Sequence, residues 1–138
     1  MAEMTWRTVD LMLALRLTES RRDYQQIIVS VSRDGFSATR NSWLDAGDIE
    51  QFADQVRHMW QDLAGAAELV GEHGADFSIR LTMASGGHVD IDITINEVWG
   101  TLQLHARTDQ TFLPALRDGL QSLTELGRHQ PTHHQPST

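Results

Sequence analysis

Residues 77–95 of this chain, FSIRLTMASGGHVDIDITI, contain two runs in which apolar and polar residues alternate. A period of two is typical of a β-strand with one buried face and one face in water. The triplet Ser85-Gly86-Gly87 separates the runs and predicts a turn between them. Keeping Met83 opposite Val89 requires a three-residue loop, and the same register places Arg80 across from Asp92. The stretch therefore predicts an antiparallel hairpin.

The same alternation occurs at residues 9–17 and 27–31, which predicts two earlier strands with one buried face each. Asp34-Gly35 then predicts a type I′ turn, because both central residues of that turn need a positive φ. The turn pairs Arg33 with Phe36, and we expect Phe36 and Ala38 on the core side of a third strand.

Two segments carry apolar residues at the spacing of one helical face. The first covers residues 49–63, with Asp45 as its expected N-cap and Gly65 as its expected stop. The second covers residues 112–123 and follows Asp109 as its cap. Residues 68–75 lie between the first helix and the next strand and are expected to form a loop.

The predicted order is three strands and a helix, repeated once along the chain. It indicates an α+β fold in which a six-stranded, mainly antiparallel sheet has both helices packed on one face. Residues 1–126 are expected to form a single domain. Residues 127–138, GRHQPTHHQPST, have no apolar period and are expected to be a disordered tail.

The composition excludes several chemistries. The chain has 138 residues and no cysteine, so it has no disulfide, thiolate zinc site, iron–sulfur cluster or cysteine nucleophile. With 11 Lys and Arg against 19 Asp and Glu, its net charge is −8. This charge argues against nucleic acid or an anionic membrane as a partner and favours a basic protein. Without a signal or membrane-spanning segment in the sequence, we expect a cytoplasmic protein.

The outer face of the second group of strands is a candidate recognition surface. If Asn96-Glu97 forms a tight turn, Asp92 faces Thr101, Asp90 faces Gln103 and Thr94 faces Trp99. A partner would then meet an aromatic anchor beside carboxylates. The expected partner-binding residues on this face are Arg80, Asp90, Asp92, Trp99, Gln103 and His105. The alternative is an ordinary solvated sheet face with one cross-strand ion pair.

Catalytic and metal-binding interpretations have weaker support. Asp90 and Asp92 lie on one strand face, as an acid–base pair or a hard-metal site would need, but Arg80 is expected to pair with one of them. His88 and His105 could meet across the second hairpin, yet no third zinc ligand has a suitable spacing. We therefore expect no enzyme activity, no metal and no cofactor.

The alternative function left open is a small-molecule-binding or hydrolytic domain that uses Asp90, Asp92 and His105 around Trp99. The remaining tryptophans Trp43 and Trp60, beside and within the first helix, are expected in the core. The histidines of the tail, His129, His133 and His134, have no expected role.

A series of short motifs resembles known bacterial domains. It consists of Gly35-Phe36-Ser37-Ala38, Trp43-Leu44, the helix with Phe52, Gly87-His88-Val89 and Trp99. The series looks like a family of small, largely uncharacterised domains of actinomycete-type bacteria, and its plan is similar to WapI-type immunity proteins of polymorphic toxin systems. The resemblance covers residues 9–126 and implies a sheet with two helices, no cofactor and the binding of a cognate toxin. It supplies no catalytic residues, and the oligomeric state stays open, a dimer included.

Overall fold

The computed structural model describes the backbone of residues 2–129 and the side chains of residues 2–125. The strands of the first half are β1 (Ala2–Arg7), β2 (Met12–Ser20), β3 (Tyr24–Arg33) and β4 (Phe36–Asp45), and helix α1 (Asp48–Asp62) follows them. The strands of the second half are β5 (Ala66–Gly71), β6 (Phe77–Met83), β7 (His88–Glu97) and β8 (Gly100–Asp109), and helix α2 (Leu113–His129) follows them. Short 3-10 turns cover Glu72–Gly74 (η1), Ser85–Gly87 (η2) and Gln110–Phe112 (η3).

The eight strands form two four-stranded antiparallel sheets, in the orders β1-β2-β3-β4 and β5-β6-β7-β8. The α+β class is as predicted, but the single six-stranded sheet is wrong. Two strands were missing from the prediction. Strand β1 precedes the first predicted strand, which was expected to begin at residue 9. Strand β5 overlaps the predicted loop at residues 68–75. Strand β5, AAELVG, is rich in alanine and glycine, which have low strand propensity, so its pattern was weak.

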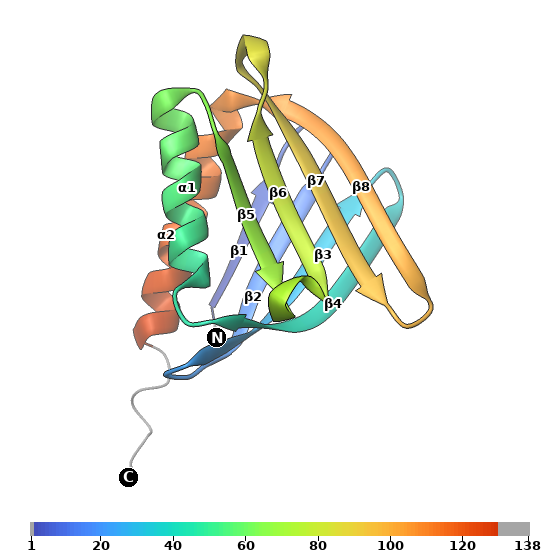
Figure 1. The fold of residues 1–138 in the computed structure, drawn as a ribbon, viewed down its shortest axis with the longest axis vertical. Coiled ribbons are helices and arrows are strands. Elements are labelled where there is room, and N and C mark those ends of the chain that lie inside the picture. Colours follow the sequence, from blue (N-terminus) through green and yellow to red (C-terminus); the bar gives the residue numbers. More distant parts are fainter. Residues whose placement is uncertain (1, 130–138) are drawn as a thin grey trace.

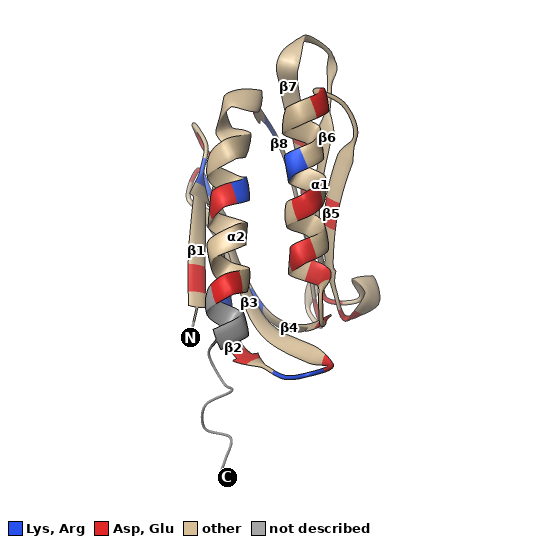
Figure 2. Ribbon diagram, turned by 90° about the vertical axis from the view of Figure 1, so that its left-hand side faces the viewer, with Lys and Arg blue, Asp and Glu red and all other residues tan. Residues whose placement is uncertain are grey.

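The predicted duplication is present in an extended form, four strands and a helix repeated once. The two sheets lie one in front of the other, and their strands cross in the view of Figure 1. Each helix packs along the first strand of the other half: α1 contacts β5, and α2 contacts β1. The helices lie side by side and contact each other, with β1 flanking α2 and β5 flanking α1 (Figure 2). They therefore connect the two halves, whereas the prediction placed them on one face of a single sheet.

The core lies between the sheets and the two helices. The inward residues of the predicted strands are buried as expected, for example Leu13, Val29 and Ile91. Both predicted helical stripes are confirmed except at the end of the first, where Leu63 is 52% exposed because it forms the left-handed C-cap of α1. They consist of Ile49, Phe52, Val56 and Met59 on α1, and of Leu113, Leu116, Leu120 and Leu123 on α2. Burying a large apolar side chain contributes about 1.5–3 kcal/mol, so these stripes account for much of the driving force for folding.

The predictions fail at the ends of strands. Phe36 was expected to face the core but is 66% exposed, because it directly follows the Asp34-Gly35 turn at the tip of the hairpin. The turn itself is confirmed, since Arg33 pairs with Phe36 and Val31 with Ala38. Val9, expected to begin a strand, is exposed in the connection between β1 and β2.

The helix caps also differ in detail. The N-cap of α1 is Gly47, at φ 94°, rather than Asp45. The Asp48 carboxylate accepts a hydrogen bond of 2.9 Å from the backbone N–H of Asp45, so the two aspartates still define the start of the helix. The C-cap of α1 is Leu63, before the predicted stop at Gly65. Asp109 caps the turn that leads into α2, as its side chain accepts a 2.9 Å hydrogen bond from the backbone N–H of Thr111.

Helical backbone continues through His129, past the start of the predicted tail at residue 127. The rest of that tail, with His133 and His134, lies outside the described residues. No helix in the described part of the chain is long and apolar enough to cross a membrane.

Candidate functional site

The outer face of the second sheet carries most of the predicted partner-binding residues. Arg80 lies opposite Asp92, as predicted, and Thr82 lies opposite Asp90. The next hairpin has a different register, because its turn is at Val98-Trp99, between paired Glu97 and Gly100.

Asp92 is therefore opposite His105, and not opposite Thr101 as predicted. Asp90 lies opposite Arg107 instead of Gln103, and Thr94 opposite Gln103 instead of Trp99. The two registers differ by four residues, so both put the same side chains on the same face. Alternation alone could not distinguish them.

The charged side chains of this face are paired across the strands. The Asp92 carboxylate is 2.7 Å from His105 Nδ1, and Arg107 Nε donates a 2.8 Å hydrogen bond to Asp90 Oδ1. Arg80 was expected to pair with Asp90 or Asp92 but forms its ion pair with Glu68 of β5, at 3.9 Å. The missing strand explains this error, because β5 places Glu68 directly opposite Arg80.

The Asp90–Arg107 pair also changes the acidity of both groups. The hydrogen bond from Arg107 is the main cause that lowers the pKa of Asp90 below its ordinary value. The same bond raises the pKa of Arg107. Both side chains lie at the surface, where such pairs contribute little to folding stability.

Trp99 does not lie among these carboxylates. It occupies the tip of the β7–β8 hairpin with Val98, and its exposed fraction is 74%. Asp92 lies five residues before Glu97 on β7, which is about 16 Å at the usual strand rise of ~3.3 Å per residue. The predicted group is thus divided into a polar face, with Arg80, Asp90, Asp92, Gln103 and His105, and a separate apolar tip. Asp92 and His105 meet, whereas Trp99 lies away from them.

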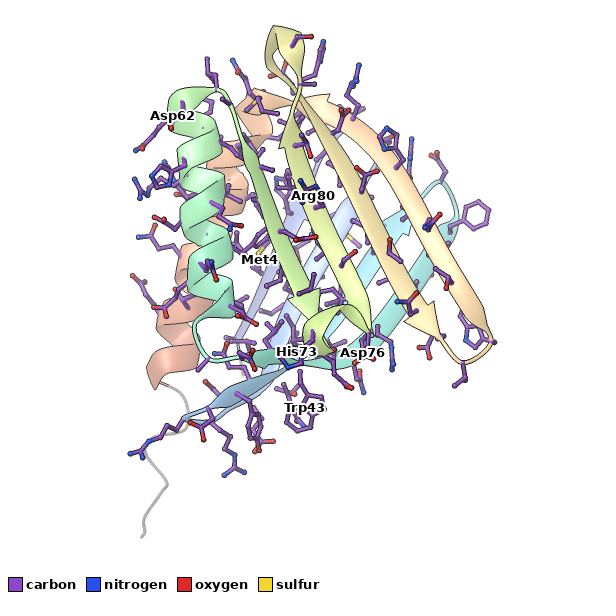
Figure 3. The ribbon with its side chains drawn as sticks, viewed as in Figure 1. Met4, Trp43, Asp62, His73, Asp76 and Arg80 are labelled. Atoms are coloured by element: carbon purple, nitrogen blue, oxygen red, sulfur yellow. The ribbon has the colours of Figure 1, made fainter. Side chains whose placement is uncertain are left out.

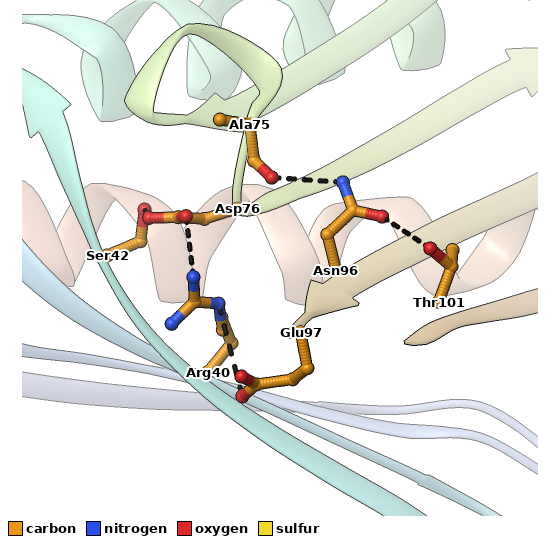
Figure 4. Close-up of polar contacts among 7 residues, drawn as sticks. All are labelled: Arg40, Ser42, Ala75, Asp76, Asn96, Glu97 and Thr101. Carbon is orange, nitrogen blue, oxygen red and sulfur yellow. Dashed lines mark hydrogen bonds and ion pairs between the residues drawn. The ribbon is translucent and has the colours of Figure 1, made fainter. Parts of the chain in front are cut away.

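A polar network below this tip was not predicted. Asp76, immediately before β6, is 8% exposed and accepts hydrogen bonds at both carboxylate oxygens. Arg40 Nη2 donates to Oδ1 and Ser42 Oγ donates to Oδ2, each at 2.7 Å (Figure 4). Arg40 Nε also lies 4.0 Å from the Glu97 carboxylate, at the end of β7. Arg40 therefore joins the first sheet to the second.

Asn96 extends the network along the hairpin. Its side-chain amide donates a 3.0 Å hydrogen bond to the backbone oxygen of Ala75, and its amide oxygen accepts one of 3.0 Å from the Thr101 hydroxyl (Figure 4). Its backbone N–H donates to the backbone oxygen of Asp76 at 2.9 Å. The base of the Val98–Trp99 tip is thus attached to β4 and to the segment before β6.

The sequence contained one signal for this network. Alternation placed Ala38 inward, and the same period places Arg40 and Ser42 inward on β4. Polar side chains on a core face must find partners, because burying them without hydrogen bonds is costly. The sequence does not show that the partner is Asp76, thirty-six residues beyond Arg40.

The turn beside Asp76 has an uncommon backbone. Glu72 and His73 adopt positive φ angles of 49° and 56°, and Gly74 follows at 94°. Left-handed non-glycine residues are sparsely populated and persist where the surroundings hold them. Here the backbone N–H of Asp76 bonds to the oxygen of Gly71 at 3.2 Å, which closes the turn.

A hollow of about 390 Å³ lies between this turn and strands β3 and β4. We call it the Trp43 hollow; its lining includes Gln26, Arg40, Trp43, Glu72 and Asp76. Trp43 was expected in the core but is 40% exposed, because the inward positions of this part of β4 are Ser42 and Leu44. Its ring contacts Tyr24 edge-on, with centroids 4.7 Å apart. Figure 3 shows Trp43, His73 and Asp76 at one end of the molecule, away from Arg80.

No group of three or more His, Asp or Glu side chains in the described part of the chain could hold a metal ion. The fold and these surfaces define a two-sheet α+β domain with an acidic, partly aromatic exterior. The chain belongs to the WapI-like immunity protein family, whose model matches residues 14–126. The resemblance to WapI-type immunity proteins is thereby confirmed.

A search of curated proteins found no match. Among solved structures, the chain is similar to a chain from the structure of a guideRNA-binding protein complex bound to a gRNA. The TM-score is 0.50 at 11% sequence identity, over 92% of this chain and 90% of that one. At this identity the similarity concerns the fold alone.

Proposed function

We propose that this protein is an immunity protein that neutralises a cognate bacterial toxin by binding to it directly. Membership of the WapI-like immunity family over residues 14–126 is the observation that carries the proposal. Neutralisation by binding requires a stable complementary surface and no catalytic group in the immunity protein. We also propose that it acts in the cytoplasm, as a non-enzymatic protein.

The partner is a basic protein domain. The net charge of −8 favours it, and acidic residues outnumber basic ones in the chain; those on the two helices are red in Figure 2. The acidic residues of the helices are Asp48, Glu50, Asp54, Asp62, Asp118 and Glu125. Charge complementarity of this kind mainly accelerates association, and it makes the rate sensitive to salt.

The contact surface consists of the outer face of the β7–β8 hairpin and its tip. The polar face offers the carboxylates of Asp90 and Asp92 to basic groups, with Arg80, Gln103 and His105 beside them. Trp99 is the anchor, because an exposed tryptophan that becomes buried in a partner pocket is a typical hot spot. The Asp76 network supports this arrangement, since a tip that is already held in place loses less entropy on binding.

The test is co-expression with the toxin-like protein encoded beside its gene, followed by size-exclusion chromatography. We expect one peak that contains both proteins, and survival of cells that the toxin alone would kill. Reversing the charges of Asp90 and Asp92 should weaken the complex, whereas Glu3→Lys on β1, in the other sheet, is the matched control. If the protein elutes alone and the neighbour is harmless without it, the proposal fails, and a small-molecule function around Asp92 and His105 becomes the better one.

A further inference from the structure

We propose that the Trp43 hollow is a binding site for a basic side chain, arginine or lysine, of a protein partner. The inference deepens the proposed function, which supplies the identity of that partner. It concerns a different surface from the β7–β8 hairpin and rests on the charges, the aromatic ring and the backbone that surround the hollow.

The charge of the hollow is negative. Glu72 is exposed at its rim, and among the described residues its carboxylate forms no hydrogen bond or ion pair. Arg40 is the cation in the lining, but it already forms ion pairs with Asp76 at 2.7 Å and with Glu97 at 4.0 Å. Glu72 therefore remains as the uncompensated charge, and a cation entering the hollow would pair with it.

Trp43 supplies the second element of recognition. Arginine and lysine bind favourably over the face of a tryptophan ring, which is the strongest of the aromatic partners for a cation. The ring is 40% exposed, and Tyr24 packs against it at an interplanar angle of 68°, which restricts its orientation. A carboxylate and an aromatic ring that line one hollow match both the charge and the apolar stem of a long basic side chain.

The walls of the hollow are held in place before any ligand arrives. Asp76 is buried between Arg40 and Ser42, and Glu72 keeps a left-handed backbone at φ 49°. Gly71, next to Glu72, has no room for a side chain, since a Cβ would lie 2.4 Å from Ser42 Oγ. Because these groups are fixed, little ordering is needed on binding.

The groove between the two helices is the competing site for a basic group. It is lined by Asp54 and Glu50, but also by Arg57 and Arg117. Arg57 forms an ion pair with Asp54, and Arg117 forms one with Asp118. The carboxylates of that groove thus have cations beside them, whereas Glu72 does not, so the Trp43 hollow is the better site.

The experiment titrates the isotope-labelled full-length protein with a tetra-arginine peptide and with a tetra-glutamate peptide of the same length. NMR follows the indole N–H signals of the four tryptophans, so that each site is observed separately. We expect saturable shifts of the Trp43 indole and of the backbone amides around Glu72 with the arginine peptide only. Glu72→Gln and Trp43→Ala should each weaken binding by about fivefold or more. Glu68→Gln, which changes an exposed carboxylate on β5, and Phe36→Ala, which removes an exposed aromatic ring at the tip of the β3–β4 hairpin, should leave it unchanged.

Shifts confined to the helices, or equal affinity in Glu72→Gln and the unchanged protein, would overturn the inference. The peptide experiment needs no toxin, so its failure differs from a failure of the proposed function. If the toxin binds but the peptide does not shift Trp43, the function stands and the site is wrong. If the peptide binds at Trp43 while no toxin complex forms, the site stands without the proposed partner.

Discussion

Arg40 on β4 and Asp76 before β6 form an ion pair of 2.7 Å that joins the two sheets. The pair is partly buried, with 27% of the Arg40 side chain and 11% of the Asp76 side chain exposed. Ser42 occupies the second carboxylate oxygen, so Asp76 has a donor on each side. The same arginine lies beside Glu97, at the base of the β7–β8 tip. The Arg40 side chain thus connects strand β4, the turn before Asp76 and the β7–β8 hairpin that we propose for partner binding.

Asp76→Ala should lower the free energy of unfolding by about 3 kcal/mol, because it leaves Arg40 and Ser42 partly buried without their acceptor. Urea denaturation measures the change. The matched control is Asp118→Ala, an exposed aspartate paired with Arg117, with an expected change within about 0.5 kcal/mol. Equal effects of the two substitutions would show that the Asp76 network does not stabilise the fold.

Gly71→Ala should be destabilising by about 1–3 kcal/mol. The added methyl group would lie 2.3 Å from Phe77 Cε2 and 2.4 Å from Ser42 Oγ, so buried groups must move. Gly119→Ala on α2 provides the contrast. Its methyl group would meet the flexible end of Met4 at 3.3 Å, and alanine is favoured over glycine inside a helix by about 1 kcal/mol.

Thermal unfolding of the two glycine variants, followed by circular dichroism, tests this contrast. We expect a lower melting temperature for Gly71→Ala and an unchanged or higher one for Gly119→Ala. The opposite order would mean that the segment around Gly71 adapts more easily than its contacts indicate.

Trp99→Ala should leave the melting temperature unchanged and weaken a toxin complex by roughly 30-fold, as expected for an interface hot spot. The side chain is 74% exposed at a hairpin tip, so its removal opens no cavity in the core. Phe36→Ala is the matched control, because Phe36 is 66% exposed at the tip of the β3–β4 hairpin. Calorimetric titration with the toxin domain compares the variants, and equal losses for both would count against Trp99 as a specific anchor.

Arg107→Gln should raise the pKa of Asp90 back toward the ordinary aspartate value of about 3.9. In the unchanged protein the hydrogen bond from Arg107 lowers the pKa of Asp90. The pair therefore stabilises the folded state at pH values above the ordinary aspartate pKa. This contribution to stability decreases once the pH falls below the ordinary aspartate pKa of about 3.9. It is lost when the pH has also fallen below the lowered pKa of Asp90 in the folded protein. An NMR titration of the Asp90 carboxyl carbon measures both values. An identical pKa in the two proteins would contradict the hydrogen bond between Arg107 and Asp90.

Several features could be predicted because they depend on residues close together in the sequence. The Asp34-Gly35 turn fixes its own pairing of Arg33 with Phe36, and the Ser85–Gly87 loop places Arg80 opposite Asp92. The stripes of α1 and α2 follow from helical spacing alone. The family was also evident from short motifs, and the match over residues 14–126 confirms it.

Other features could not be predicted from local pattern. The observed β7–β8 register differs from the predicted register by four residues. Every strand side chain keeps its predicted face, but Trp99 lies at the tip and His105 lies opposite Asp92. Strand β5 lacked β-branched residues in most positions, so it resembled a loop and its Glu68 was not considered as a partner of Arg80. The predicted binding group therefore had the right outward residues on the strands but the wrong neighbours.

The sequence by itself determined which side of each recognised strand and helix is buried, because a period of two or of 3.6 specifies a face without reference to the rest of the chain. It also determined the acidic charge and the exclusion of cysteine chemistry. Only the tertiary structure decided that the strands form two sheets, that each helix packs on the other half, and that Arg40 meets Asp76. Those contacts join residues far apart in the chain, and periodicity does not encode which distant surfaces meet, since many pairings bury the same apolar faces.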